Sequence, residues 1–251
     1  MEAGAFGGIR TTVKRKQRND RTEEECWYME RIDVRRKDGS CTGEVKERSQ
    51  IHRDGDLHGT SHVWLVRYRA EKKSADVLLQ KRSADKDSFP GCYDISSAGH
   101  IPAGMDFRES ALRELKEELG ITARAEELHD RFIHIGYKEA VFHGKPFKNY
   151  EYSHVYLYEC ELEPEEMLLQ KEEVESVLWM DFQECLEHLQ KDDIDHCIFL
   201  DEFEELAKQI VAYFTETGRP IETRPLALTW AEDAQNELED WIEEQGIYIR
   251  Q

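Results

Sequence analysis

Residues 99–121 read GHIPAGMDFRESALRELKEELGI, and this stretch combines a glycine-containing loop with a strongly patterned helix. Within residues 106–119 the apolar side chains at helical spacing are Ala111, Leu112, Leu115 and Leu119. Such spacing is typical of an amphipathic helix that buries one face. Asp106, followed three residues later by Glu109, predicts a capping box at the start of the helix, and Gly120 predicts its C-terminal cap.

Three carboxylates stand on this helix at positions i, i+3 and i+4, and they are Glu114, Glu117 and Glu118, projecting from one side. Like charges at this spacing destabilise a helix, so the cluster favours a divalent cation, and Mg²⁺ prefers such hard oxygen ligands. A bare cluster of this kind in so acidic a chain is also typical of a solvated helix face. The preceding loop favours the metal site, because Gly99 and Gly104 let the backbone turn tightly and approach a ligand.

Strands and helices are interleaved on both sides of this stretch. The apolar-rich runs that predict strands are residues 62–68, 77–81, 93–97 and 150–160. A further run, VESVLWM, leads into a helix that begins at Asp181, and residues 198–214 have helical periodicity. This order predicts the α/β class, with a mixed sheet covered by helices on its faces.

The chain is strongly acidic, because its 251 residues include 54 Asp and Glu against 34 Lys and Arg, a formal net charge of -20. General binders of nucleic acid or of membrane surfaces need a basic face, so the composition argues against both classes. An anionic substrate would have to be met by a bound metal or by a few local cations. The six scattered cysteines predict a reducing cytoplasm, and without a signal-peptide pattern or a long apolar run we expect neither secretion nor membrane insertion.

Residues 99–121 resemble the Nudix box, in which a Gly, five residues, a Glu and seven residues precede R-E-apolar-x-E-E-x-G-apolar. The positions that match this pattern are Gly99, Arg113, Glu114, Leu115, Glu117, Glu118, Gly120 and Ile121. One position departs from it, because Met105 stands where the box has its first Glu, with Asp106 next to it. The strand order around the box is similar to the Nudix fold over residues 25–190, which implies an α/β/α sandwich with a mixed sheet.

The resemblance implies Mg²⁺-dependent hydrolysis of a diphosphate linkage in a nucleoside diphosphate joined to another group, with Mn²⁺ as a substitute for Mg²⁺. It implies that Glu114, Glu117 and Glu118 bind the metal or hold the base that activates water. It also implies that the Gly99 carbonyl completes the metal shell and that Arg113 orients a glutamate. The expected partner is therefore a small-molecule diphosphate.

A narrower resemblance connects the stretches IHRDGDLHGTSHVWL and CYDISSAGH to isopentenyl-diphosphate isomerase. His52, His58 and His100 match three histidines that bind a metal in that enzyme, which implies a second metal site. Glu151 matches one of two glutamates that complete the site there, and Asn149 replaces the other. Histidines near turns and strand starts also commonly complete hydrogen-bond networks, and from the sequence we favour this second interpretation.

Ala98 argues against the isomerase reaction itself, because the isomerase has its catalytic cysteine directly before the box glycine. A proton-transfer isomerase needs an acid and a base, and alanine supplies neither. An isomerase-like enzyme is thus the alternative to a hydrolase. A non-catalytic diphosphate-binding protein is a further alternative, motivated by Met105 and by the helical C-terminal region.

Glu151 lies in the predicted strand over residues 150–160. Alternation places Glu151, Ser153 and Val155 on one face and Tyr150, Tyr152 and His154 on the other. The sequence leaves open which of the two faces is wet. A carboxylate from a strand facing the box helix would serve as a further metal ligand or as a general base.

The chain divides into three predicted parts, which are a flexible basic arm over residues 1–23, a Nudix-like domain over 24–190 and a helical C-terminal extension over 191–251. The extension leaves open whether its helices close over the site, pair two subunits or cap the sheet. Its large apolar side chains include Trp230, Trp241 and Ile242. They expose more apolar surface than an isolated appendage can hide, which predicts a homodimer.

Overall fold

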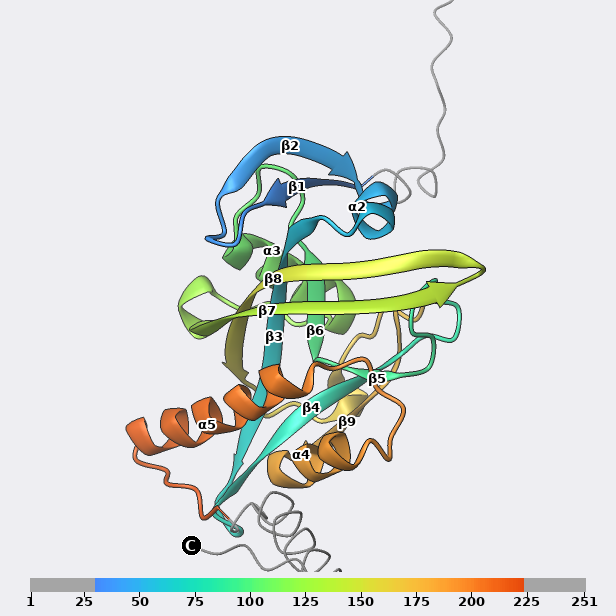
Figure 1. The fold of residues 1–251 in the computed structure, drawn as a ribbon. Coiled ribbons are helices and arrows are strands. Elements are labelled where there is room, and N and C mark those ends of the chain that lie inside the picture. The colour runs from blue at the N-terminus through green and yellow to red at the C-terminus, as the bar shows by residue number, and fades with distance from the viewer. Residues whose placement is uncertain (1–29, 224–251) are drawn as a thin grey trace, which may run out of the picture.

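Residues 30–223 are described by the computed structural model, and they form a mixed sheet with helices on both faces (Figure 1). The predicted arm over residues 1–23 lies outside this range, and so do Trp230, Trp241 and Ile242, on which the homodimer prediction depends. No helix within residues 30–223 is long and apolar enough to cross a membrane. The cysteines in the same range are free thiols.

Strand β3 (Leu57–Arg69) is the centre of the sheet, because strands pair with it on both sides. Its neighbours are β8 (Lys145–Glu159), which runs parallel to it, and the antiparallel strands β1 (Arg31–Arg35), β4 (Ser74–Arg82) and β6 (Ser97–His100). The outer strands are β2 (Cys41–Glu47) beside β1, β5 (Tyr93–Asp94) and β9 (Val174–Asp181) beside β4, and β7 (His129–Phe142) beside β8. The predicted mixed sheet is confirmed.

Strand β3 is covered on both faces, which explains its continuous apolar run. Trp64 and Val66 belong to one hydrophobic cluster, and Val63 and Leu65 belong to a second cluster on the opposite face. A strand buried on both faces needs apolar side chains at every position and loses the alternation of a half-exposed strand.

The single strand predicted over residues 93–97 is wrong, because the chain forms two short strands, β5 and β6, separated by Ile95 and Ser96. The Ser96 hydroxyl accepts a hydrogen bond from the Leu65 N–H at 2.9 Å and donates one to the Leu78 carbonyl at 2.6 Å. A side chain therefore satisfies backbone groups of β3 and β4 at the point where these strands separate. Sequence patterns record no such contact, since its partners are distant in the chain.

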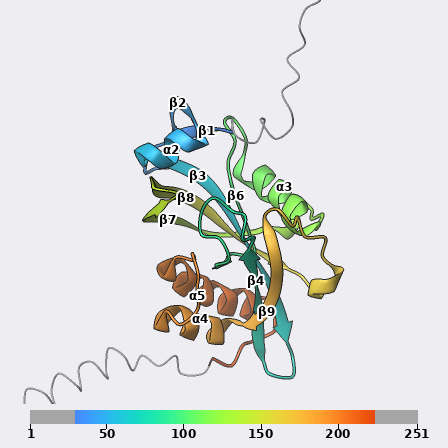
Figure 2. The same cartoon turned by 90° about the vertical axis from the view of Figure 1, so that its right-hand side faces the viewer.

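Helices cover the two faces of the sheet unequally (Figure 2). Helix α3 (Phe107–Leu119) lies on one face, and α4 (Phe182–Lys191) and α5 (Leu200–Glu216) lie together on the other. The remaining helical segments are α2 (Arg48–Asp54), η1 (Ala125–Glu127) and η2 (Pro164–Glu166). This layered arrangement confirms the predicted α/β sandwich.

The ends of α3 follow the sequence pattern. The Asp106 carboxylate accepts hydrogen bonds from the backbone N–H groups of Arg108 and Glu109, which makes it the N-cap. Gly120 ends the helix with a left-handed φ of 70°. The N-cap at Asp106 and the C-terminal cap at Gly120 are confirmed, and they fix the position of the helix carboxylates relative to the sheet. The predicted capping box is only half formed, because among residues 30–223 the Glu109 side chain does not accept a hydrogen bond from the Asp106 N–H.

Helix α5 packs into the core of the sheet. Its side chains Phe203, Leu206 and Phe214 are fully buried in the same cluster as Trp64 and Phe182. The predicted domain boundary after residue 190 remains a prediction, and the packing places α5 in the same hydrophobic layer as the strands.

Candidate active site

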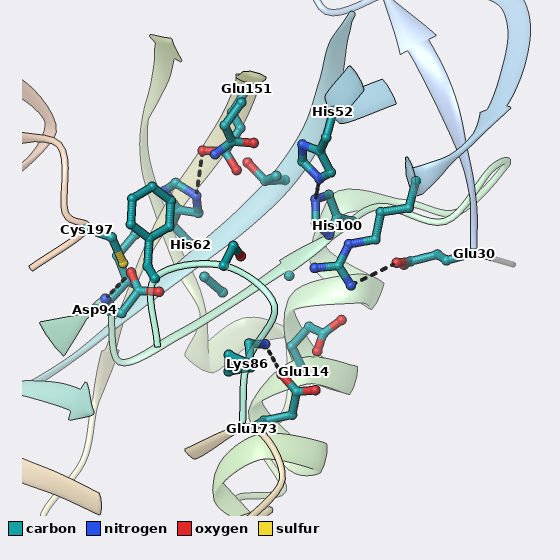
Figure 3. A pocket seen from close by; sticks show the side chains of 18 of the residues that line it. Glu30, His52, His62, Lys86, Asp94, His100, Glu114, Glu151, Glu173 and Cys197 are labelled. Atoms are coloured by element: carbon teal, nitrogen blue, oxygen red, sulfur yellow. Dashed lines mark hydrogen bonds and ion pairs between the residues drawn. The ribbon is translucent and has the colours of Figure 1, made fainter. Parts of the chain in front are cut away.

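A pocket of about 600 Å³ opens beside β6 and α3 (Figure 3). A pocket of this size suits a small molecule. The charged side chains that line it are Glu30, Arg31, Arg48, Arg82, Lys86, Asp94, Arg113, Glu114, Lys138, Glu151 and Glu173. The pocket thus supplies the local cations that the acidic composition requires of a site for an anionic substrate.

The structure brings most of the sequence-predicted residues to this pocket. Those that line it are Gly99, Arg113, Glu114, Glu151, His52 and His100. His58 and Glu118 are buried, and Glu117 is exposed. The three glutamates of α3 therefore share one helix but differ in their exposure to solvent.

Gly99 and the Glu114 side chain approach each other so closely that a larger residue at position 99 would displace the Glu114 carboxyl group. A Cβ atom at Gly99 would lie 2.3 Å from the Glu114 carboxylate, far inside van der Waals contact. Burial raises the pKa of Glu114 to about 7, with the charge of Glu117 adding to the shift and Arg113 opposing it. The carboxyl group is therefore held beside the backbone of β6 in a poorly solvated position.

Glu118 lies one turn further along α3 and is more deeply buried. Its carboxylate accepts a hydrogen bond from the Ala98 N–H at 3.3 Å. Burial, followed by the charge of Glu114, raises the pKa of Glu118 to about 8. Two neighbouring carboxyls that resist ionisation would ionise readily beside a divalent cation, because the cation favours their charged forms.

Arg113 lies between the carboxylates of Glu114 and Glu117. It donates hydrogen bonds to Glu114 at 2.6 Å and to Glu117 at 2.8 Å. Its Nε is buried with no hydrogen-bond partner among residues 30–223. Met105 lines the pocket but offers no carboxylate to Arg113, and the Asp106 carboxylate caps the start of α3.

His52, His58 and His100 come together from α2, β3 and β6. One ring nitrogen from each lies within 4.8 Å of the others, and His52 Nε2 lies 3.1 Å from His100 Nε2. Burial, followed by the charges of His58 and Arg48, lowers the pKa of His52 to about 3. Burial also lowers the pKa values of His58 and His100, so all three rings are neutral.

Two nitrogens of these rings, His52 Nδ1 and His58 Nε2, are buried without a hydrogen-bond partner among the described residues. A hydrogen-bond network, the interpretation that the sequence favours, would have satisfied them. Neutral imidazole nitrogens are instead common metal ligands. The donor set therefore fits a metal ion better than a closed hydrogen-bond network.

Glu151 faces the pocket from β8, so the face that carries Glu151, Ser153 and Val155 is the one turned to the site. The parallel register of β3 and β8 places Glu151 opposite His58. Asn149 also lines the pocket, and its Oδ1 is buried without a partner among residues 30–223. The β3–β8 pairing brings Glu151 to the histidine cluster across 93 residues of sequence.

Sequence reasoning missed the role of His62 and of Glu202. His62 Nδ1 lies 2.9 and 3.0 Å from the two carboxylate oxygens of Glu202, and Trp64 Nε1–H donates to the same carboxylate at 3.1 Å. Glu202 is completely buried on α5. A signal was present, because Glu202 is an acidic residue on the apolar face of its helix, four residues from Leu206.

The cations of the pocket are paired with acidic residues at its rim. Arg48 lies 3.8 Å from Glu30, and Lys86 forms an ion pair with Glu173 (Figure 3). An incoming phosphate can exchange with such carboxylates, because it offers several acceptor oxygens to each cation. These side chains are candidates for binding the phosphates of a substrate.

The NUDIX domain family matches residues 59–203 of this chain. Nudix hydrolase 3 of Arabidopsis thaliana is 42% identical over 167 residues, which cover 65% of this chain and 21% of the plant protein. An uncharacterized Nudix hydrolase of Clostridium acetobutylicum is 38% identical over 144 residues, which cover 57% of this chain and 66% of that protein. The chain thus matches less than two thirds of the length of either relative.

The crystal structure of DR0079 from Deinococcus radiodurans superposes on 70% of this chain and 98% of its own, with a TM-score of 0.52 at 16% identity. At this identity the likeness concerns the fold. An isopentenyl-diphosphate Delta-isomerase of Photobacterium profundum is 34% identical over 77 residues, which cover 31% of this chain and 42% of that protein. That match is short, and Ala98 still stands directly before Gly99.

Proposed function

This chain belongs to the Nudix family of hydrolases, and on that premise we propose that it cleaves a diphosphate linkage of a small molecule with Mg²⁺. The observation that carries the proposal is the pair of carboxyls on α3, half-buried Glu114 and buried Glu118, packed against the backbone at Gly99 and Ala98. Burial and mutual repulsion disfavour the two negative charges unless a cation is bound. Nudix hydrolases generally use divalent metal ions, typically Mg²⁺, and Mn²⁺ would substitute.

Each polar group around the proposed cation would have its own role. Glu114, Glu118 and the Gly99 carbonyl would hold the cation, and Glu117 would complete the cluster from the solvent side. The cation would neutralise the charge that develops on the leaving phosphate. Arg113 orients Glu114 and Glu117 through its two hydrogen bonds.

The substrate would bind with its phosphates among the pocket cations. Arg48 and Lys86 would exchange their carboxylate partners for phosphate oxygens. Glu151, on β8, would act as a general base or as a further metal ligand. The substrate class we propose is a nucleoside diphosphate joined to another group, and the pocket of about 600 Å³ is where it would bind.

An activity screen tests the proposal directly. The purified protein with Mg²⁺ or Mn²⁺ is incubated with nucleotide sugars, dinucleotides and prenyl diphosphates, and phosphate-containing products are measured. Glu118→Gln, Glu117→Gln and Glu114→Gln are expected to lower turnover of any cleaved substrate by about 100-fold or more. Glu109→Gln changes an exposed carboxylate on the same helix and should leave turnover unchanged. Full activity in Glu118→Gln would remove this site from the mechanism.

We also propose a second metal at His52, His58 and His100, with Glu151 beside them. The neutral rings and their unpaired nitrogens support this assignment. Metal analysis of the purified protein should detect a tightly held ion that His52→Ala and His100→Ala both lose. Retention of the same metal content in both variants would show that the histidines bind none.

The histidine cluster is also the observation that favours an isomerase-like enzyme as the second candidate function. Ala98 is the observation against it, because it cannot transfer a proton. Incubation with isopentenyl diphosphate in deuterated water decides between the two, since an isomerase introduces deuterium into the carbon skeleton. We expect no deuterium to be introduced.

A further inference from the structure

His62 on β3 lies between two carboxylates that come from different elements. Its Nδ1 is hydrogen-bonded to both carboxylate oxygens of Glu202 on α5, at 2.9 and 3.0 Å. Its Nε2 lies 3.9 Å from an oxygen of Glu151 on β8, as an ion pair (Figure 3). The imidazole ring therefore bridges the C-terminal helix and the strand that carries Glu151.

The Glu202 end of this bridge is rigid. Glu202 is completely buried and also accepts a hydrogen bond from Trp64 Nε1 at 3.1 Å. His134 Nδ1 lies 3.2 Å from the same carboxylate, without the alignment of a hydrogen bond. A buried carboxylate that accepts hydrogen bonds from His62 and Trp64 and lies against His134 has little freedom to turn, so the ring of His62 is held in one orientation.

The Glu151 end of the bridge faces the pocket. Both His62 and Glu151 line it, and Glu151 lies opposite His58 in the parallel register of β3 and β8. Because Glu202 holds the Nδ1 edge of the ring, the Nε2 edge is the one that faces the Glu151 carboxylate.

We propose that Glu202, acting through His62, is a positioning residue for Glu151. Helix α5 would then contribute a functional residue to the site. The proposal rests on the role of Glu151 in the proposed function. In other proteins, metal-binding and catalytic side chains are commonly oriented by hydrogen bonds to a further residue behind them. Removing that further residue typically lowers activity by about 10-fold to 100-fold. The positioning role also gives the C-terminal helix a function besides covering the sheet.

Steady-state kinetics of the full chain test the proposal with a matched control. His62→Gln and Glu202→Gln are expected to lower kcat by about 10-fold to 100-fold while KM changes by less than about threefold. Glu204→Gln neutralises an exposed carboxylate on the same helix that does not contact His62, so it should keep kcat. Equal kcat losses in Glu204→Gln and Glu202→Gln would mean that the loss does not depend on the buried contact with His62, which overturns the proposal.

A double-mutant cycle identifies the residue through which the effect passes. On a Glu151→Gln background, His62→Gln should cause little further loss, because the group that it positions is already absent. Full additivity of the two losses would contradict the proposal.

Crystal structures of the wild type and of Glu202→Gln give a result that needs no turnover. The Glu151 carboxylate should lie beside His62 in the wild type and should be displaced or disordered in Glu202→Gln. An unchanged Glu151 in the variant would overturn the positioning role. If the wild type cleaves no diphosphate but Glu151 moves as expected, the proposed function fails and the positioning role stands.

Discussion

A methyl group at position 99 would lie 2.3 Å from the Glu114 carboxylate, so glycine allows this carboxylate to lie against the backbone of strand β6. The same close approach explains why Glu114 and Glu118 are so poorly solvated. At the scale of single residues, the site depends on small side chains in β6, where the backbone itself lies against the carboxylates.

Gly99→Ala should abolish metal-dependent hydrolysis, because the added methyl group displaces the Glu114 carboxylate from the backbone of β6. We expect a fall in kcat/KM of about 100-fold or more. Gly104→Ala is the control, since its φ of 79° is unfavourable for alanine but no atom lies within 4 Å of the added Cβ. It should cost about 1 kcal/mol of stability through backbone strain and keep most of the activity. Equal activity in the two variants would contradict this assignment.

The His62–Glu202 pair should make stability depend on pH with a defined sign. The His62 pKa is raised from 6.5 to about 9. The stability that protonated His62 contributes to the fold is therefore fully present below pH 6.5 and is lost as pH rises through 9. Burial opposes the charge of Glu202, but His62 and His134 together lower the Glu202 pKa from 4.5 to about 2. The stability that ionised Glu202 contributes to the fold is therefore fully present above pH 4.5 and is lost as pH falls through 2.

Thermal unfolding of the wild type and of Glu202→Gln between pH 4.5 and 9.5 checks this dependence. The two melting temperatures should differ most between pH 4.5 and 6.5, by about 10 °C, because breaking a buried ion pair costs several kcal/mol. The difference should shrink towards pH 9. A difference that stays constant over the whole range would show that His62 does not carry the charge.

At the scale of elements, α3 is positioned by its two ends and by its buried face. Asp106 begins the helix, Gly120 ends it, and Leu115 and Leu119 are completely buried under the sheet. The start of the helix also determines how far its glutamates lie from β6. Local sequence therefore determines both the existence of this helix and the placement of its carboxylates.

Asp106→Ala should destabilise the protein by about 1 kcal/mol, because two backbone N–H groups lose their acceptor. This corresponds to a fall of about 2–4 °C in the melting temperature of a domain of this size. Asp106→Asn retains an oxygen that can cap the helix, so its stability should be close to that of the wild type. Differential scanning calorimetry measures both changes, and a wild-type melting temperature in Asp106→Ala would refute the capping role.

At the scale of the whole molecule, the sheet separates two hydrophobic clusters, and the pocket draws residues from the elements around it. One cluster lies under α3 and the other under α4 and α5. The described residues also leave apolar side chains exposed on the outer strand β7, namely Ile133, Ile135, Tyr137 and Val141. The predicted homodimer stays a prediction, and light scattering that shows a monomer would contradict it.

A chain that ends at residue 191 should fail to fold cooperatively. It lacks Phe203, Leu206 and Phe214, each fully buried on α5, and losing even one such side chain typically costs about 2–5 kcal/mol. A chain that ends at residue 223 keeps α5 and serves as the control, with a single sharp unfolding transition by circular dichroism. Cooperative unfolding of the shorter chain would instead support the predicted boundary after residue 190.

The sequence by itself determined helix α3, its caps, the placement of Glu114, Glu117 and Glu118 on that helix, and the mixed α/β class. These features depend on residues within about four positions of one another or on the order of elements along the chain, so a linear pattern records them. The break at Ser96 could not be read in this way, because its partners belong to two other strands.

Only the tertiary structure decided which face of β8 is turned to the pocket and which residues gather there. The histidine cluster joins α2, β3 and β6, and the bond between His62 and Glu202 spans 140 positions of the sequence. Contacts of this kind form when distant elements pack, and burial then shifts the pKa values of the groups that meet there. A solvated acidic face and a cation site look alike in sequence, and the position of half-buried Glu114 against Gly99 is the observation that supports the proposed cation site.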